Sequence, residues 1–451
     1  MGYLVVGLAA MLLLSPRVLY ADPWRFASRF LTTPWPWNVL AADNGHRELF
    51  PNLVRVLELQ WLQGNQWLQI LVGASLACAT GVALARGIRR DPAPAGARAA
   101  ALFFALAGIF WLGNERSLAH GNESVHAYLV TLCLVGGCWW AADGSSQGAT
   151  RRLGGVLLLG AMAALSFGSG IACFAAFLLV MWLRRASWRE MSVLVAGGIA
   201  MSVLHLLPGD GGVGAAAGVP SGQHLLRWLS APFLYAAWPL LDPDVAAQIP
   251  LAPVRQACEW LARAFQDLFG PVATALWPNA LVALAGIAWL LRSTWLVRQD
   301  REASRMTRVA LGVAWFAWVV GVLVCVSRAN YFIEYPGQVV ALRYVPWSSL
   351  FWSGLAIATV LRAGKRHEPR TIACALVLAA ALLPSQGWMA LLAYRTQALA
   401  ESNATAAAVG VLGEDEALGE NVAHEIATAR PLLRESGTAM FAWPEARLLG
   451  Q

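Results

Sequence analysis

Apolar stretches of about twenty residues alternate with short polar connections from Gly2 to Ala393, which is the length that a helix needs to cross a bilayer core of about 30 Å. The stretches 65–85 and 309–327 contain no charged residue. Such uninterrupted runs are typical of membrane-spanning helices rather than of the core helices of soluble domains. The pattern therefore predicts an all-α, polytopic transmembrane protein.

We expect about 11 spans, within a range of about 10 to 13, from the number of apolar runs that reach spanning length. The Trp-rich segment 225–241 is a further candidate, which we interpret as interfacial or re-entrant because counting it would move the next basic loop across the membrane. The first run lacks the basic start of a signal peptide, so we interpret it as a retained helix. The predicted spans are 2–20, 65–85, 99–113, 125–142, 153–167, 170–183, 191–207, 271–291, 309–327, 345–361 and 371–392.

Arginines gather in every second connection, and the positive-inside rule places those connections in the cytoplasm. This orientation predicts a bacterial inner-membrane protein with a cytoplasmic N-terminus and a periplasmic C-terminus. Residues 1–393 would form the transmembrane domain, with external loops at 21–64 and 208–270, and residues 394–451 a small periplasmic tail. The basic connections hold Arg86, Arg89, Arg90 and Arg98; Arg151 and Arg152; Arg184, Arg185 and Arg189; Arg292, Arg298, Arg301, Arg305 and Arg308; and Arg362, Lys365, Arg366 and Arg370.

The first external loop contains an amphipathic juxtamembrane helix at about residues 48–63, by its helical spacing of apolar positions. Apolar residues recur every four positions from Leu49 to Trp61, while Asn52, Arg55 and Glu58 form a polar stripe. We expect this helix to lie on the membrane with its apolar face in the lipid and its polar face in water.

Composition supports a membrane protein: 58% of the residues are hydrophobic, 13% are charged, and the mean hydropathy is +0.54. The net charge of +7 does not indicate nucleic-acid binding, because the arginines lie in short loops at span ends. Six of the seven cysteines fall in apolar runs and show neither metal-ligand spacing nor a disulfide framework. The sequence also lacks the phosphate-binding, dinucleotide-binding and hydrolase motifs of soluble enzymes.

Three polar clusters lie at predicted external span ends, around residues 43–48, 114–126 and 328–344. A carboxylate there could act as general base for an acceptor hydroxyl, and arginines could bind a lipid phosphate. Ordinary solvated loop charges are the alternative interpretation of each cluster. The candidate catalytic residues are Asp43, Asp22 and Glu48, and the candidate substrate- or phosphate-binding residues are His46, Arg47, Arg116, Arg328, Arg343 and Tyr344.

No metal ligands are assigned, because the external histidines match no known ligand spacing. A divalent cation held by His46, His120 or His126 with nearby carboxylates stays an alternative, and the cofactor is left unknown.

Several short segments resemble a family of uncharacterised bacterial multi-spanning membrane proteins. They are residues 42–51, which match a first-loop pattern of Asn-Glu-His-Arg type, together with 166–170, 341–344, 348–352 and 432–441. One departure is Gly45, where that family has an acidic residue before the histidine. The family is distantly similar to the GT-C glycosyltransferase superfamily, whose long first external loop carries a surface helix and an acidic base. The resemblance implies Asp22 or Asp43 as that base and a polyprenyl-phosphate sugar as donor.

The sequence thus predicts a GT-C-like glycosyltransferase that moves a sugar from a polyprenyl-phosphate donor to an envelope glycan or lipid acceptor. Its expected partners are the bilayer, the lipid-linked sugar and envelope-assembly proteins. One alternative is an O-antigen polymerase or ligase, in which Arg227, Arg255 and Arg263 of the later external loop would matter more. A non-enzymatic lipid or glycan transporter is another, but the spans show almost no internal charge and no repeat.

Overall fold

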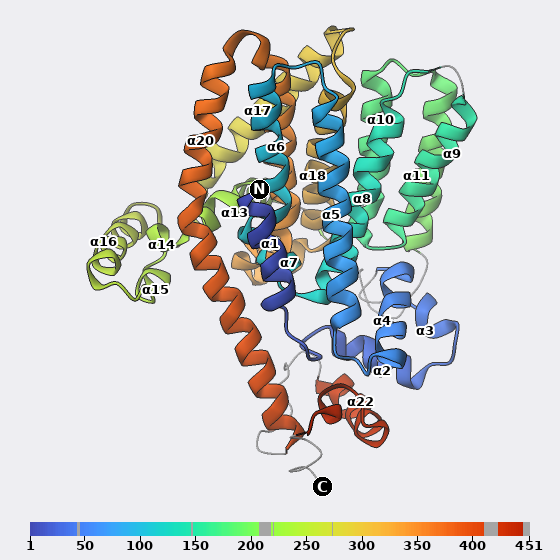
Figure 1. Cartoon of the computed structure of the whole chain (residues 1–451), viewed down its shortest axis with the longest axis vertical. Coiled ribbons are helices and arrows are strands. Elements are labelled where there is room, and N and C mark those ends of the chain that lie inside the picture. The colour runs from blue at the N-terminus through green and yellow to red at the C-terminus, as the bar shows by residue number, and fades with distance from the viewer. Residues whose placement is uncertain are drawn as a thin grey trace.

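The computed structural model describes most of the chain as helices and their connections (Figure 1). The described residues are 1–42, 46–145, 148–206, 218–219, 221–272, 274–409 and 423–444, without the side chains of 206, 276 and 364–367.

A helix lies at each of the predicted spans, which confirms the all-α polytopic membrane fold. Seven helical segments of the described chain are long and apolar enough to cross a membrane, and two shorter apolar helices accompany them. The bundle helices are α1 (Gly2–Leu13), α5 (Trp67–Arg89), α6 (Ala95–Phe110), α8 (Gly121–Ala141), α9 (Ala149–Ala164), α10 (Ala172–Leu183), α11 (Trp188–Leu206), α17 (Leu276–Gln299), α18 (Arg305–Ser327) and α20 (Val345–Ala408).

The first helix is shorter than the span predicted at 2–20. α1 has 12 residues and is therefore about 18 Å long, well short of a bilayer core. The chain leaves the helix at Leu14 before Ser15 and Pro16, since proline cannot continue a helix interior.

The long helix α20 folds back on itself, as Figure 1 shows at the top of the molecule. Ser353 packs against Gly108 of α6. Ser385 accepts a hydrogen bond at 2.8 Å from the indole N–H of Trp111, which lies only three residues after Gly108 in the chain. In a straight helix these two serines would lie about 48 Å apart, so the chain must reverse between them. α20 therefore contributes to two spans. The first, Pro336–Ala363, includes the turns that precede α20, and the second is Glu368–Ala408.

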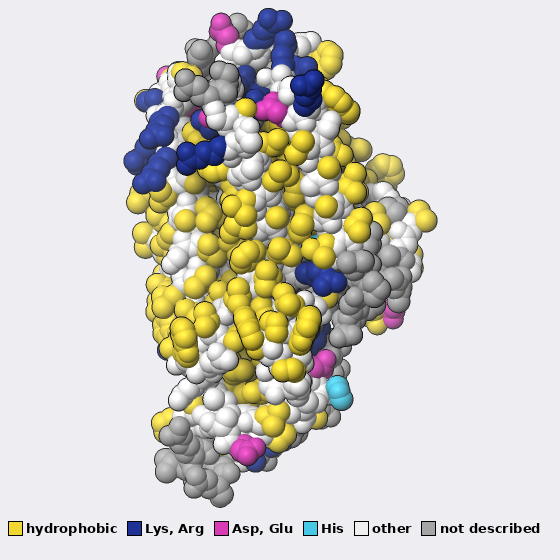
Figure 2. All heavy atoms as spheres, turned by 90° about the vertical axis from the view of Figure 1, so that its right-hand side faces the viewer, with side chains coloured by type: hydrophobic (Ala, Val, Ile, Leu, Met, Phe, Trp, Pro, Cys, Tyr) yellow, Lys and Arg dark blue, Asp and Glu magenta, His cyan; other side chains and the backbone are white. Residues whose placement is uncertain are grey.

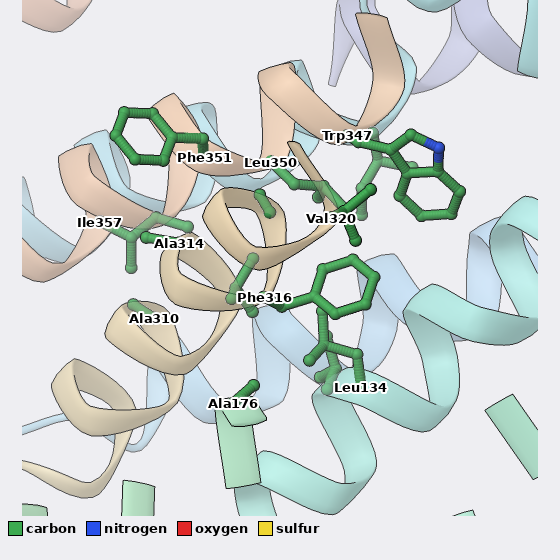
Figure 3. Close-up of a cluster of buried hydrophobic side chains, with 14 of the residues drawn as sticks. Leu134, Ala176, Ala310, Ala314, Phe316, Val320, Trp347, Leu350, Phe351 and Ile357 are labelled. Carbon is green, nitrogen blue, oxygen red and sulfur yellow. The ribbon is translucent and has the colours of Figure 1, made fainter. Parts of the chain in front are cut away.

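The bundle core lies between α18 and the first half of α20 (Figure 3). Phe316 and Val320 of α18 contact the layer formed by Trp347 and Leu350. Leu134 of α8 and Ala176 of α10 complete the cluster from the other side of α18. Small residues bring the backbones close, as expected for packing between membrane helices.

Lys and Arg side chains gather at one end of the bundle on the face that Figure 2 shows, here called the arginine-rich end. Arg152 and Arg184 both bind Glu190 at 2.9 Å, and Arg185 donates to the carbonyl of Arg298 at 3.3 Å. These contacts join the connections before α9, between α10 and α11, and between α17 and α18. The clustering agrees with the threading predicted from the arginines.

The opposite end carries short helices and a second, smaller core. Residues of the first loop, the end of α20 and α22 share that core, whose buried members include Trp24, Ala404 and Leu433. The helices at this end are α2 (Pro23–Thr32), α3 (Trp37–Leu40), α4 (Leu49–Trp61), α7 (Glu115–Leu118), α19 (Ala329–Glu334) and α22 (Ala423–Ser436), with short 3₁₀ turns η1 (Leu112–Asn114), η2 (Gly168–Ile171), η3 (Pro336–Val340), η4 (Leu342–Tyr344) and η6 (Ala439–Ala442).

The segment predicted to be interfacial or re-entrant forms α13 (Gly222–Ala236), which packs inside the bundle against α17 and α20. Trp228 on this helix is fully buried. α13 leads into a lateral group of helices that stands beside the bundle in Figure 1. They are α14 (Trp238–Leu241), α15 (Pro243–Ala246) and α16 (Ala252–Phe269).

Candidate functional site

The amphipathic helix exists as α4, but its polar stripe faces the interior of the protein rather than water. Asn52, Arg55 and Glu58 lie on one helix face by their spacing of three residues, and all three are buried. Trp61, expected in the apolar seam, is 73% exposed. The prediction that the polar stripe faces water is wrong because neighbouring segments supply hydrogen-bond partners for it inside the protein.

Arg55 is the centre of a buried polar network. Its Nη1 donates to Glu48 Oε2 at 2.6 Å and to Asn52 Oδ1 at 2.7 Å, and its Nε donates to Asn122 Oδ1 at 2.7 Å. Its guanidinium lies 3.6 Å from the ring centroid of Phe26 on α2. One side chain therefore fixes α2 and α4 of the first loop against the start of α8.

Glu48 is held in its charged form by this network. Burial alone would raise the pKa of the carboxyl, but the charges of Arg55, His126 and His46, with the hydrogen bond from Arg55, bring the pKa below its ordinary value. A carboxylate bound so tightly is a weak proton acceptor. The geometry gives Glu48 the role of positioning Arg55.

Two imidazole rings, those of His46 and His126, pack against Phe167 next to this network. The ring of His126 stacks on Phe167 with centroids 4.3 Å apart, and that of His46 lies 4.6 Å away on a tilted plane. A side chain at position 168 would clash with the His46 ring, so glycine at this position leaves room for the ring. The predicted first-loop cluster and the predicted second cluster are thus brought together.

Within the second cluster, Glu123 joins His126 to Arg116. The carboxylate lies 3.0 Å from His126 Nε2 and 3.6 Å from Arg116 Nη2. Nearby, burial together with the charge of Arg116 lowers the pKa of His120 to about 3, so this ring is neutral at neutral pH. A neutral imidazole can orient a hydroxyl group without repelling a cation. With so low a pKa, however, the ring is a weak proton acceptor.

The other candidates of the first loop are placed differently. Asp43 lies outside the described residues, between Ala42 and His46. Asp22 sits before α2, is 43% exposed and forms a 3.0 Å ion pair with Arg25. Arg47 donates from Nε to the carbonyl of Leu204 at 2.9 Å, which ties the loop to the end of α11.

The third predicted cluster forms a separate group beside the first two. Arg343 donates to Gln338 at 3.1 Å and lies 5.1 Å from the ring centroid of Tyr344, whereas Arg328 lies 6.0 Å from that of Tyr331. The turn η4 that carries Arg343 and Tyr344 packs against η1 and α7, which holds Arg116. The group therefore adjoins the second cluster through the backbone.

A small pocket opens beside the Arg55 network, with about 300 Å³ of empty space that includes space open to solvent. Glu58 lines it and accepts a hydrogen bond at 3.0 Å from the backbone N–H of Gln69. Burial raises the pKa of Glu58 despite hydrogen bonds from the start of α5. Phe26, Gln66 and Asn122 complete a wall of mixed aromatic and polar groups.

Sequence reasoning missed Arg55, Asn52 and Glu58 as members of the site, although it recognised them as a stripe. The available signal was that the stripe contains two opposite charges beside a polar loop, in a chain with few charges. Within the described residues, no group of three or more His, Cys, Asp or Glu side chains could hold a metal ion.

No protein-family model matches the chain, and no curated protein matches it. A solved structure to which the chain is similar is the archaeal oligosaccharyltransferase AglB from Archaeoglobus fulgidus, in complex with an inhibitory peptide and a dolichol-phosphate. The TM-score is 0.45 and the sequence identity 12%, over 92% of this chain and 58% of that one. The chain thus spans just over half the length of that protein, and the likeness does not identify its family.

Proposed function

We propose that the chain is an integral membrane glycosyltransferase of GT-C type. It would transfer a sugar from a polyprenyl-phosphate donor to an envelope glycan or lipid acceptor. The reaction would take place at the end opposite the arginine-rich end. By the positive-inside rule, that is the periplasmic side of a bacterial inner membrane.

One observation carries the proposal: Arg55 joins the first loop to α8 in a buried network, next to the His46, Phe167 and His126 stack. Carboxylate, guanidinium and imidazole groups from distant parts of the chain meet at helix ends on one face of the bundle. Glycosyl transfer from a lipid phosphate needs these groups in one place, because one must accept a proton and others must stabilise a phosphate leaving group.

Asp43 is the proposed general base, because Glu48 is neutralised by Arg55 and Asp22 by Arg25. The described residues that flank Asp43 in the chain are the buried Ala42 and His46, which packs against Phe167. A carboxylate at this position of the chain would remove the proton of the acceptor hydroxyl as the new glycosidic bond forms.

The proposed phosphate-binding residues are His46, Arg47 and Arg116, with Arg328, Arg343 and Tyr344 on the side of η4. Arginine suits this task because its planar fork binds two phosphate oxygens at once. The released polyprenyl phosphate carries the negative charge that develops as the sugar leaves, and these cations stabilise it.

The proposal is tested by sugar transfer in membranes that contain the full chain and a panel of polyprenyl-phosphate sugars. Loss of a general base costs about 100-fold or more, so Asp43→Asn should reduce transfer by that factor. Arg47→Gln should reduce it as well. The exposed Asp244 on the lateral α15 gives a matched control, Asp244→Asn, which should transfer at the wild-type rate.

Full transfer by Asp43→Asn would contradict the base assignment. Loss of product on Arg227→Gln alone, with Asp43→Asn unaffected, would favour the polymerase or ligase alternative. Arg227 is buried and donates to the carbonyl of Pro336 at 3.4 Å, whereas Arg263, also of the later external loop, is 69% exposed and bound to Glu259.

A further inference from the structure

An apolar groove runs between α10 and α11 on the outside of the bundle. Its empty space is about 670 Å³, including space open to the surroundings. Val195, Ile199 and Val203 on α11 are 40 to 58% exposed along it. Figure 1 places both helices at the right of the molecule, the side that Figure 2 shows as a broad hydrophobic band. The full lining is Ile171, Phe174, Ala175, Leu178, Leu194, Val195, Gly198, Ile199, Ser202 and Val203.

The groove is open because two small residues lie between its larger apolar side chains. Ala175 on α10 and Gly198 on α11 have little or no side chain to fill the space between the helices. A Cβ at Gly198 would lie only 3.1 Å from Phe174. The hydroxyl of Ser202 needs no hydrogen-bond partner from a bound molecule, because it donates to the carbonyl of Gly198 at 2.9 Å. The wall from Leu194 to Val203 extends about 14 Å along α11. A single hydrocarbon chain fits a groove of this shape and character.

The end of the groove away from the arginine-rich end meets the candidate site. Leu204 follows Val203 and its carbonyl binds Arg47 at 2.9 Å, and His205 comes next. On the other wall, Ile171 is one turn from Gly168, against which the His46 ring packs. Arg47, His46 and His205 therefore lie within about one helical turn of the groove's end.

We propose that this groove binds the hydrocarbon chain of a polyprenyl phosphate, with its phosphate at Arg47, His46 and His205. The inference rests on the proposed function, because it names the place where the lipid donor enters that site. Charge complementarity selects this occupant: the apolar groove ends at groups that can pair with a phosphate. A diacyl phospholipid would place only one of its two chains between the helices, so it fits the groove less well.

The test measures binding of radiolabelled polyprenyl phosphate to the full chain in detergent micelles. Ala175→Phe fills the groove and should weaken binding about tenfold or more, because the chain loses most of its apolar contact. Ala200→Phe is the matched control, since Ala200 is exposed on α11 but does not line the groove, and it should bind like the wild type. Unlabelled polyprenol should compete less well than polyprenyl phosphate, and Arg47→Gln should remove that difference.

Val203→Trp gives a second variant that does not depend on core packing, because Val203 is 52% exposed at the edge of the groove. Weaker binding by either folded variant, with an unchanged control, supports the proposal. Undiminished binding by both variants, or displacement of the label by phosphatidylglycerol as effectively as by polyprenyl phosphate, overturns it.

The binding assay needs no turnover, so the two proposals fail separately. If the groove variants lose binding but no polyprenyl-phosphate sugar is transferred by the wild type, the groove assignment stands and the transferase assignment fails. If transfer depends on Asp43 while both groove variants bind the lipid normally, the groove assignment fails alone.

Discussion

At the scale of single residues, the structure depends on an ion pair that is removed from water. Arg55 and Glu48 are each 5% exposed and 2.6 Å apart. The pair is tolerated because Asn52 and Asn122 satisfy further groups of the guanidinium. Breaking a buried pair leaves a lone charge in a dry site, which costs more than the pair contributes.

Arg55→Met should therefore destabilise the protein by about 3–5 kcal/mol, because Glu48 is left buried without its partner. Thermal unfolding in detergent micelles measures the loss. The double variant Glu48→Gln with Arg55→Met should recover part of it, since no charge remains. An equal loss in the double and single variants would show that the two charges are not coupled.

Acid should weaken the same network. The folded-state pKa of Glu48 lies below its unfolded value, so the stabilisation is complete above the unfolded pKa and disappears as the pH falls through the folded one. Unfolding temperatures measured from pH 7 down to pH 3 should fall less steeply in Glu48→Gln than in the wild type. Parallel curves for the two proteins would show that Glu48 does not contribute to the pH dependence of stability.

The sequence predicted which loops carry the site but not how their side chains pair. The proximity of residues 46–48 to 116–126 follows from span ends that share one face. The Arg55 pairing does not follow, because an amphipathic stripe is equally compatible with water on its polar side or with partners such as Asn122. That choice depends on tertiary contacts between α2, α4 and α8, which sequence spacing does not encode.

At the scale of helices, close packing between α18 and the first half of α20 determines the bundle. A Cβ at Gly354 would lie 2.6 Å from the carbonyl oxygen of Ala310, which is backbone and cannot rotate away. The hydrophobic runs predicted both helices, since each is long and uncharged. Their line of contact was not predicted, because apolar residues occupy every side of each helix.

Gly354→Ala should destabilise the protein by about 1–3 kcal/mol, since the two helices must move apart. Gly387 lies on the same helix with open space at its Cβ position. Gly387→Ala should instead leave stability unchanged or raise it slightly, because alanine favours helix. Thermal unfolding of both variants in the same detergent gives the comparison, and an equal effect at the two positions would contradict this packing.

The length of the second half of α20 also lay beyond sequence reasoning. The span predicted at 371–392 ends where the apolar run ends, yet Glu368–Ala408 has 41 residues and is about twice as long as a bilayer core is thick. Its extension is stabilised outside the bundle by Ala400 and Ala404 in the smaller core. Contacts with distant segments, rather than local hydropathy, set this helix end.

At the scale of the whole molecule, the smaller core joins both ends of the described chain. It contains Trp24 and Ala27 of α2, Ala404 of α20 and Leu433 of α22. Ala439 adds a backbone hydrogen bond at 2.6 Å to the carbonyl of Gln63, beside the start of α5. The C-terminal residues thus support the first loop, on which the candidate site is built.

Leu433→Ala should loosen this unit, since removing a buried leucine side chain costs about 2–5 kcal/mol. Hydrogen exchange should accelerate in α2 and α22 while the amides of α18 stay protected. Leu432→Ala is the control, because Leu432 is only partly buried and lies outside the smaller core. Unchanged exchange in α2 would mean that α22 does not support the first loop.

The most direct test determines on which side of the membrane the end opposite the arginine-rich end lies. Single cysteines at the exposed Gln60, Glu334 and Arg89, in a chain whose seven cysteines are replaced by alanine, would be labelled in intact cells with a membrane-impermeant maleimide. The account predicts labelling of Gln60→Cys and Glu334→Cys from outside, and of Arg89→Cys only after the cells are opened. Labelling of Gln60→Cys and Glu334→Cys from different sides, or of both only in opened cells, would contradict it.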